Sequence, residues 1–308
     1  MPAIGPRTPF GRHGSPTTAG SGDAGRMPDD RRSPKQQRWS WDPSLYAGSA
    51  GHYVVGRVPY PPGVAQTLVD RLGLDGAGIL LDVGCGPGSL TLLLAPYVAE
   101  AIGVDADADM LTAAASIASR RGIQNVRWKH LRAEQLPDDL PSPCLITLAQ
   151  SFHWMDRPRV ARTLREMLEP GGALVHVSAT THWGAEAEHT DRPGAPPWRA
   201  IETLVATYLG SDRRAGQGTR GAERDDEDTI YSAAGFAGPH RLEVPGWTVE
   251  RSRDDVVAAV HSLSWAAPHL FGDRLTQFDS DLNRLLADAM TGDTFPETMR
   301  PVVLDIWR

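Results

Sequence analysis

Apolar and polar positions alternate along the middle of the chain in a way that predicts strands and helices in turn. Nearly continuous apolar runs such as "CLITLAQ" are typical of strands buried on both faces. Apolar residues three or four positions apart, as at Val160 and Leu164 in "RPRVARTLREMLEPGG", indicate amphipathic helices. The runs predict strands over 78–84, 101–105, 125–130, 144–150 and 173–179. The periodic stretches predict helices over 60–74, 89–96, 107–122 and 157–172.

Strands that alternate with helices at these lengths form parallel βαβ units. We therefore expect an α/β fold: a Rossmann-like, doubly wound, mostly parallel sheet with helices on both faces. After residue 180 the pattern changes, with helices over 196–210 and 254–265 and another around Phe278. Late strands are expected within 238–251 and in the final "PVVLDIWR". The helical stretches between them should form a C-terminal cap over the mouth of the sheet.

This pattern divides the chain into four parts. Residues 1–37 are rich in Gly, Pro, Ser, Thr, Asp and Arg and predict a disordered tail. Residues 38–75 should form an N-terminal lid segment, residues 76–180 a cofactor-binding core, and residues 181–308 the substrate cap with the last strands of the sheet.

Composition narrows the possible functions. With 308 residues and 41% hydrophobic positions, the chain can bury a core, and its formal charge of −7 gives no reason to expect a nucleic-acid partner. It holds no apolar run of about 18 residues, so we expect no membrane span. The two cysteines form neither a disulfide framework nor a metal cluster, and we expect a cytoplasmic protein. Arg31 and Arg32 lack the apolar segment that an export signal would need.

The stretch "LDVGCGPGS" follows the first strand and holds glycines at positions 84, 86 and 88. A ligand can approach backbone N–H groups closely where a Cβ is missing. The helix that begins next adds partial positive charge, which favours an anionic ligand group. Asp105 at the end of the second strand could accept hydrogen bonds from both hydroxyls of a ribose.

Two cofactors fit this combination of a loop for an anionic group and a carboxylate for a ribose. A dinucleotide would place its pyrophosphate on the glycine loop, and S-adenosylmethionine would place its methionine carboxylate there. The dinucleotide fingerprint G-x-G-x-x-G fails, because its sixth position is Ser89. Asp82 would also repel a pyrophosphate, whereas it suits a cofactor with an ammonium and a sulfonium.

Several segments together resemble the class I S-adenosylmethionine-dependent methyltransferases, in their small-molecule branch of type 11. "LLDVGCGPGSLTLLLA" and "VDADADML" are similar to the first two motifs of that family, "RAEQLP" to the third, and "SFHWMDRPRVARTLREMLEPGGALVHV" to the segment through the fourth and fifth strands. The tyrosine, arginine and Tyr-Pro pattern over 53–61 is similar to a lid motif of that branch. The resemblance is good over about residues 45–180 and less specific at the C-terminal end.

The resemblance implies a role for each matching position. The methionine part of the cofactor would lie on Gly84, Gly86 and Gly88, with Asp82 near the ammonium. The ribose would bind Asp105, the adenine would lie between Ala106 and Met110, and Gln150 would lie close to the sulfonium. The third motif would contribute Ala133 and Glu134. Arg132 replaces the acidic residue that often meets the adenine amino group, so Glu134 or a backbone group would make that contact.

Three further residues are candidates for the site. Arg57 could pair with the methionine carboxylate or a substrate anion, or lie solvated beside a proline turn. Tyr53 could cover the cofactor or only pack the lid onto the sheet. His153 follows the fourth strand, where a substrate would meet the methyl group. It could be a general base or substrate contact, or it could shape the pocket wall together with Trp154.

We therefore expect an enzyme that transfers the methyl group of S-adenosylmethionine to a small-molecule acceptor, with neither nucleic acid nor membrane as partner. Two alternatives remain open at this stage. One is an NAD(P)-dependent oxidoreductase on a Rossmann sheet, against which Ser89 and Asp82 count. The other is a non-catalytic cofactor-binding protein of the same fold. The sequence names neither the acceptor, nor the atom methylated, nor the oligomeric state.

Overall fold

The computed structural model describes residues 42–185, 194–211, 214–215, 218–219 and 227–308. They all belong to the second of two units of the chain, Trp39–Arg308. The tail predicted over 1–37 lies outside the described residues.

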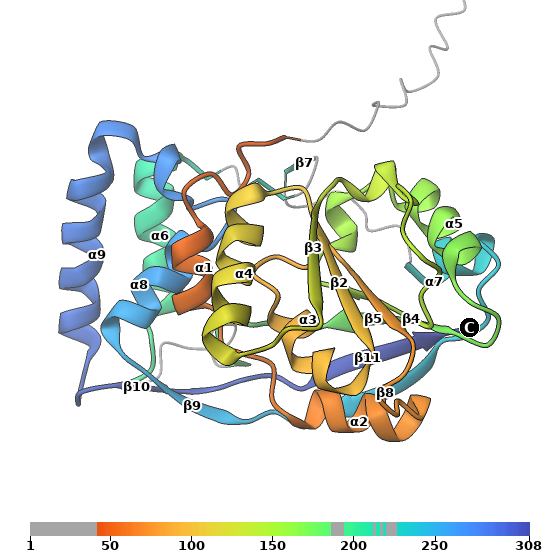
Figure 1. The fold of residues 1–308 in the computed structure, drawn as a ribbon. Coiled ribbons are helices and arrows are strands. Elements are labelled where there is room, and N and C mark those ends of the chain that lie inside the picture. Colours follow the sequence, from red (N-terminus) through yellow and green to blue (C-terminus); the bar gives the residue numbers. More distant parts are fainter. Residues whose placement is uncertain (1–41, 186–193, 212–213, 216–217, 220–226) are drawn as a thin grey trace, which may run out of the picture. The chain divides into compact units, whose positions relative to one another are not determined.

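A sheet of seven strands forms the centre of this unit, in the order β3-β2-β1-β4-β5-β11-β8 (Figure 1). Its strands are β1 (Ile79–Val83), β2 (Glu100–Asp105), β3 (Val126–His130), β4 (Leu145–Ala149), β5 (Ala173–Ser178), β8 (His240–Val244) and β11 (Val302–Trp307). The first five run parallel, and β11 runs antiparallel to both β5 and β8. This confirms the expected mostly parallel, doubly wound α/β sheet.

The strand order reverses beside β1. The chain first adds β2 and β3 on one side of β1 and then crosses to place β4 on the other side. The connections that leave β1 and β4 therefore diverge, and a crevice opens at the carboxyl ends of these two strands. A ligand site is expected at this place in an open parallel sheet.

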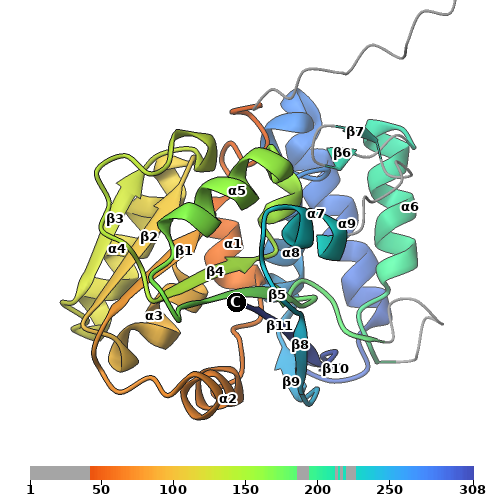
Figure 2. The same ribbon diagram turned by 90° about the vertical axis from the view of Figure 1, so that its right-hand side faces the viewer.

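Helices cover both faces of the sheet (Figure 2). The α-helices are α1 (Ala50–Gly56), α2 (Gly63–Leu72), α3 (Ser89–Leu94), α4 (Ala108–Arg121), α5 (Arg157–Met167), α6 (Trp198–Leu209), α7 (Glu227–Ala233), α8 (Arg253–His261) and α9 (Leu275–Ala289). On one face, α5 and α7 bury Leu164 and Ile230 against the sheet. On the other, α2 and α3 bury Leu68 and Leu94.

The C-terminal helices form a cap with a core of its own. Ile201 of α6, Val260 of α8, and Phe278 and Leu282 of α9 are buried together. Helix α1 packs against α8 so closely that a Cβ on Gly56 would lie 2.1 Å from the backbone nitrogen of Ala259. Figure 1 shows α1 beside the cap helices. Helix α1 of the lid therefore packs directly on the cap, whereas α2 packs on the sheet.

Two helices end at the capping and helix-breaking residues that the sequence predicted. Asp107 caps α4 by accepting hydrogen bonds from the backbone N–H groups of Asp109 and Met110, and Gly122 ends it in the left-handed conformation. Helix α3 stops at Leu94, and a 3₁₀ turn over Ala95–Tyr97 contains the expected proline break.

The region over 238–251 supplies two strands where one was expected. Strand β8 joins the main sheet, whereas β9 (Thr248–Arg251) pairs with β10 (Phe295–Thr298) in a separate ribbon. Pro245 and Gly246 lie between β8 and β9 and separate them. Two further short strands, β6 (Arg214–Ala215) and β7 (Gly218–Thr219), pair with each other.

Within the described ranges, no helix is both long enough and apolar enough to cross a membrane.

Candidate functional site

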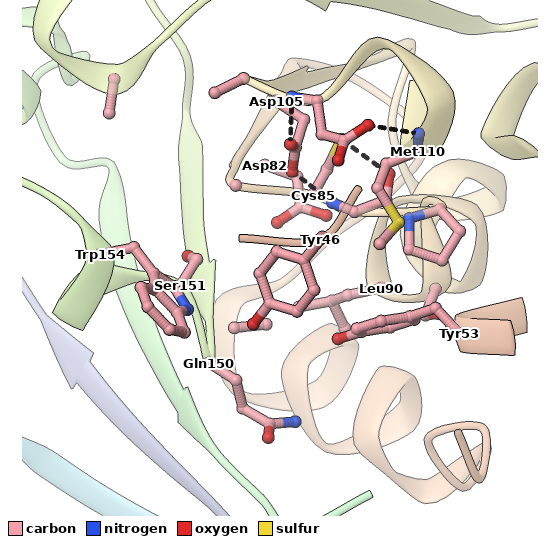
Figure 3. Close-up of a pocket in the computed structure, with 18 of the residues that line it drawn as sticks. Tyr46, Tyr53, Asp82, Cys85, Leu90, Asp105, Met110, Gln150, Ser151 and Trp154 are labelled. Carbon is pink, nitrogen blue, oxygen red and sulfur yellow. Dashed lines mark hydrogen bonds between the residues drawn. The ribbon is translucent and has the colours of Figure 1, made fainter. Parts of the chain in front are cut away.

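A pocket opens at the carboxyl ends of β1, β2 and β4, where the strand order reverses (Figure 3). It encloses about 1030 Å³, its open mouth included. Its walls come from the lid residues Tyr46–Tyr60, the glycine loop, the segment after β2, the segment around Ala133, and the segment after β4. Nearly all residues that the sequence assigned to the cofactor therefore lie around one cavity.

The three glycines of the loop have different reasons to be glycine. All three have positive φ angles, 71° at Gly84, 54° at Gly86 and 78° at Gly88. A Cβ on Gly84 would lie 2.4 Å from Cβ of Ser151, and one on Gly88 would lie 2.6 Å from the Trp128 ring. A Cβ on Gly86 would meet no atom within 4 Å. Gly86 thus leaves room on the pocket side, whereas Gly88, which does not line the pocket, makes room for a tryptophan.

Asp105 joins the glycine loop to the end of β2. One carboxylate oxygen accepts the N–H of Gly86 at 2.8 Å, and the other accepts the N–H of Asp107 at 2.9 Å. Burial raises the pKa of Asp105 to about 6, against the opposing effect of these two hydrogen bonds. Each oxygen keeps a further lone pair that a hydroxyl group could use. The geometry is consistent with the predicted ribose contact, which stays a prediction.

Asp82 lies at the floor of the pocket and is bonded from both sides. Its oxygens accept the hydroxyls of Thr91 at 2.5 Å and Thr147 at 2.7 Å, so it connects β1 to α3 and β4. Burial raises its pKa, while the threonine hydrogen bonds lower it. The carboxylate therefore has a structural role, and its predicted place near an ammonium remains open because it also lines the pocket.

The side of the pocket beyond Asp105 has the residues expected to face an adenine. Ala106, Met110, Ala133 and Glu134 all line the cavity there. One carboxylate oxygen of Glu134 accepts the N–H of Asp156 at 2.8 Å, ahead of α5. Glu134 is thus engaged through one oxygen, and its carboxylate keeps acceptor positions that could meet an adenine amino group.

Gln150 follows β4 with a φ of 56°, which is unusual for a residue with a side chain. Strained backbone of this kind often marks a functional site. The Gln150 amide donates a hydrogen bond to the Tyr60 hydroxyl at 3.2 Å and lines the pocket. Figure 3 shows Gln150 on the side of the pocket opposite Asp105.

Arg57 connects the lid to the cap and the sheet. Its guanidinium donates to the Ser262 hydroxyl at 2.8 Å and to the Ser262 carbonyl at 3.0 Å, and lies 3.1 Å from the His182 ring nitrogen. It also lies over the ring of Tyr53, with Cζ 4.5 Å from the ring centroid. Both residues line the pocket, and their roles toward the cofactor or a substrate anion stay predictions.

His153 is placed differently from the other candidates. Its side chain is exposed, its ring centroid lies 4.8 Å from that of Trp154, and it does not line the pocket, whereas Trp154 does. A role for His153 as a general base stays a prediction, and this position favours the alternative in which it supports the wall through Trp154.

Several pocket residues were not predicted from the sequence, chief among them Tyr46, Tyr60 and Ser151. Tyr46 lies edge-on to both Tyr53 and Trp154, with centroid distances of 6.3 Å and 5.7 Å. The aromatic residues after position 38 were visible in the sequence. Only the tertiary fold, however, shows which of them turn toward the sheet.

Comparison with known proteins finds similarity to methyltransferases. A sequence model described as a methyltransferase domain matches residues 80–172. An uncharacterized methyltransferase of Bacillus subtilis, YcgJ, is 36% identical over 99 residues, which is 32% of this chain and 39% of that protein. An uncharacterized methyltransferase of Mycobacterium bovis is 34% identical over 134 residues, 43% of this chain and 51% of the relative.

Two more similarities extend this comparison. A trans-aconitate 2-methyltransferase of Azoarcus is 28% identical over 138 residues, 44% of this chain and 52% of the relative. The crystal structure of the Bacillus subtilis YcgJ protein superposes with a TM-score of 0.46 and 21% identity, covering 80% of this chain and 97% of that one.

The chain spans between 39% and 52% of the length of these curated relatives. The matched domain over residues 80–172 contains the glycine loop and the strands β2, β3 and β4. Residues 80–172 therefore match a methyltransferase domain, and the relatives with 34–36% identity to part of the chain are named as methyltransferases.

Proposed function

We propose that the whole protein transfers a methyl group from S-adenosylmethionine to a small-molecule acceptor in the cytoplasm. The observation that carries this proposal is the hydrogen bond from the Gly86 N–H to the Asp105 carboxylate, which supports a ribose site beside the most open position of the glycine loop. The trans-aconitate 2-methyltransferase among the relatives is a precedent for a small acceptor.

The residues present suit this cofactor. Gly86 leaves a space that any Cβ would fill, and the carboxylate of Asp105 can accept two ribose hydroxyls. Ala106 and Met110 present apolar surface to a planar base, and Asp82 contributes negative charge near the methionine end. When bound, S-adenosylmethionine supplies a methyl group that its sulfonium has already activated for displacement.

The protein's own task is then positioning. Displacement at a methyl carbon needs the nucleophile and the leaving sulfur in line, with reacting atoms about 3–3.5 Å apart. Tyr53, Tyr60 and Gln150 enclose the pocket from the lid and from the end of β4, so they can orient an acceptor and exclude water. The close packing of α1 on α8 holds the lid in place for this purpose.

Calorimetric titration with S-adenosylmethionine and S-adenosylhomocysteine tests the proposal, with NADH and NADPH as controls. We expect micromolar binding of the first pair only. Binding of the dinucleotides alone would favour an oxidoreductase and overturn the proposal. Cofactor binding without transfer to any acceptor of a broad panel would favour a non-catalytic binding protein.

A further inference from the structure

Four side chains of the lid converge on one wall of the pocket: Tyr46, Tyr53, Arg57 and Tyr60, which we call the tyrosine–arginine cluster. The Tyr53 ring lies between the others, with Tyr46 at 6.3 Å between ring centroids and the Arg57 guanidinium at 4.5 Å. The charge of Arg57 acts on the hydroxyls of both Tyr46 and Tyr60. The lid thus presents one cation and several hydroxyls to the same space.

Arg57 has a positive charge that no carboxylate neutralises within the described residues. Its hydrogen-bond partners are Ser262, Thr181 and His182, and none of the ion pairs among described residues includes it. The buried Arg251, by contrast, pairs with Glu297 at 3.0 Å. A half-buried guanidinium on a pocket wall without a carboxylate partner favours an anionic ligand.

The hydroxyls of Tyr46 and Tyr60 can both act as donors. The Gln150 amide donates to the Tyr60 oxygen at 3.2 Å, and the Tyr46 ring lies edge-on to the Trp154 ring with centroids 5.7 Å apart. No described residue accepts the hydrogen of either hydroxyl, so both hydrogens are available to a ligand. Burial raises the pKa of both tyrosines, so both remain protonated donors near neutral pH. Together with Arg57 they form a set that matches a carboxylate.

Arg57 is anchored at a different strand from the cofactor loop. Its guanidinium bonds Thr181, which follows β5, and the N–H of Val58 donates to the Thr181 carbonyl at 2.8 Å. In the sheet order β5 lies two strands from β1, which leads into the glycine loop, and three from β2, which ends at Asp105. The contact with Thr181 therefore holds Arg57 at the β5 end of the pocket.

The described residues that line the pocket include no histidine or lysine to take a proton from an acceptor. Both oxygens of Asp82 already accept threonine hydroxyls, and those of Asp105 accept backbone N–H groups. The other lining carboxylates, Asp107 and Glu134, lie on the predicted adenine side, where one oxygen of each accepts backbone N–H groups. An acceptor whose nucleophile is already ionised needs no base. A carboxylate meets this condition at neutral pH.

We propose that the methyl acceptor is a carboxylic acid whose carboxylate binds Arg57 and the hydroxyls of Tyr46 and Tyr60 and is converted to its methyl ester. This inference rests on the proposed methyl transfer. One carboxylate oxygen stays bound to the cluster while the other forms the new bond to the methyl carbon. The carbon–sulfur bond breaks, its electron pair remains on sulfur, and no proton moves.

Transfer of label from [methyl-³H]-S-adenosylmethionine tests the class of acceptor. The acceptors are trans-aconitate, citrate, benzoate and decanoate, each beside its amide, and a deproteinised extract of small metabolites. Methyl esters release labelled methanol in alkali, whereas N-methyl and ether products do not. We expect alkali-labile label on at least one acid or in the extract, and none on the amides. Alkali-stable label, or no label while S-adenosylhomocysteine binds, would overturn the inference.

Two variants, Tyr60→Phe and Arg57→Lys, test the cluster itself. The matched control is Tyr97→Phe, because Tyr97 lies outside the pocket. Loss of one hydrogen bond to a charged group should raise the KM for the acid about tenfold or more. The dissociation constant of S-adenosylhomocysteine should change less than threefold, and the control should match the wild type. Because Tyr60→Phe retains the ring, it tests the hydroxyl even if Arg57→Lys loosens the lid.

The remaining outcome would assign the cluster to the cofactor. If Tyr60→Phe weakens S-adenosylhomocysteine but not 5′-methylthioadenosine, which lacks the methionine carboxylate, the cluster binds the methionine tail and the inference is wrong. Failure of the wild-type protein to bind S-adenosylhomocysteine at all would refute the proposed function instead. The two failures are therefore distinguishable by one calorimetric measurement on the wild type.

Discussion

Asp105 should make cofactor affinity depend on pH below neutrality. Burial raises its pKa to about 6 in the free protein, and a ribose with two hydroxyl donors requires the ionised carboxylate. As the pH falls through about 6, the carboxylate of Asp105 takes up a proton in the free protein. This proton must be released when the cofactor binds, so the affinity for the cofactor decreases. If only the ionised form binds, the affinity at pH 5 is lower by 1 + 10^(6−5), or about tenfold, than its value well above the pKa.

The variant Asp105→Asn separates this effect from other titrations. Its amide keeps one acceptor oxygen but turns an NH₂ group toward the N–H of Gly86 or of Asp107, both of which the carboxylate now binds. It also loses charge-assisted bonds to the ribose, which are worth about 1.5–3 kcal/mol each. We expect binding at pH 7 to be at least tenfold weaker, with no remaining dependence on pH between 5 and 7.

Calorimetric titration with S-adenosylhomocysteine at pH 5, 6 and 7 and constant ionic strength measures both effects. The ligand's own carboxylate and ammonium stay charged over this range, so they contribute no slope. Asp70→Asn, at an exposed position on α2, is the matched control and should behave as the wild type. A wild-type affinity that is constant from pH 5 to 7, or an equal slope in Asp105→Asn, would refute the assignment of Asp105.

The remaining predictions concern the loop, the cap and the pocket wall. Gly84→Ala should lower the melting temperature because its Cβ would meet a neighbouring side chain at 2.4 Å, whereas Gly86→Ala should stay folded but lose S-adenosylhomocysteine binding in calorimetry. Arg251→Leu leaves the carboxylate of Glu297, which is 2% exposed, without its cation, and should lower the free energy of unfolding in urea by about 3–5 kcal/mol. A loss below 1 kcal/mol would contradict that. His153→Ala should change kcat less than threefold, and a decrease of about 10²–10⁴-fold would instead identify a general base.

Most of the parallel part of the sheet was predictable because β1, β2, β4 and β5 are largely apolar runs between clear helix boundaries, whereas the edge strand β3 alternates apolar and charged residues. Helix α1 was not, since "AGHYVVG" has a glycine near its start and another at its end, and Ser49 gives it no side-chain cap. It is helical because it packs against α8, a contact between residues about 200 positions apart. The division of 238–251 into β8 and β9 likewise depends on their different partners, β11 and β10.

The cofactor side of the site was accessible to sequence reasoning because its chemistry is local. Gly84, Gly86 and Asp82 lie in one loop, and Asp105 follows the adjacent strand. The pattern could not show that Gly88 accommodates the Trp128 ring, because that contact joins the loop to another strand. The glycines of the loop are equally spaced in the sequence, but glycine is required at these positions for different physical reasons.

The tyrosine–arginine cluster could not be derived in this way, because its groups are oriented by residues far away in the sequence. Arg57 is held by Ser262, 205 residues further along the chain, and the Tyr60 hydroxyl is turned by Gln150, 90 residues further on. The sequence motif predicts that tyrosines and an arginine are present in the lid. The cap and the end of β4 then decide which hydrogen-bonding positions of these side chains remain free for a ligand. Proteins that share the glycine loop but differ in the cap should therefore bind the same cofactor and different acceptors.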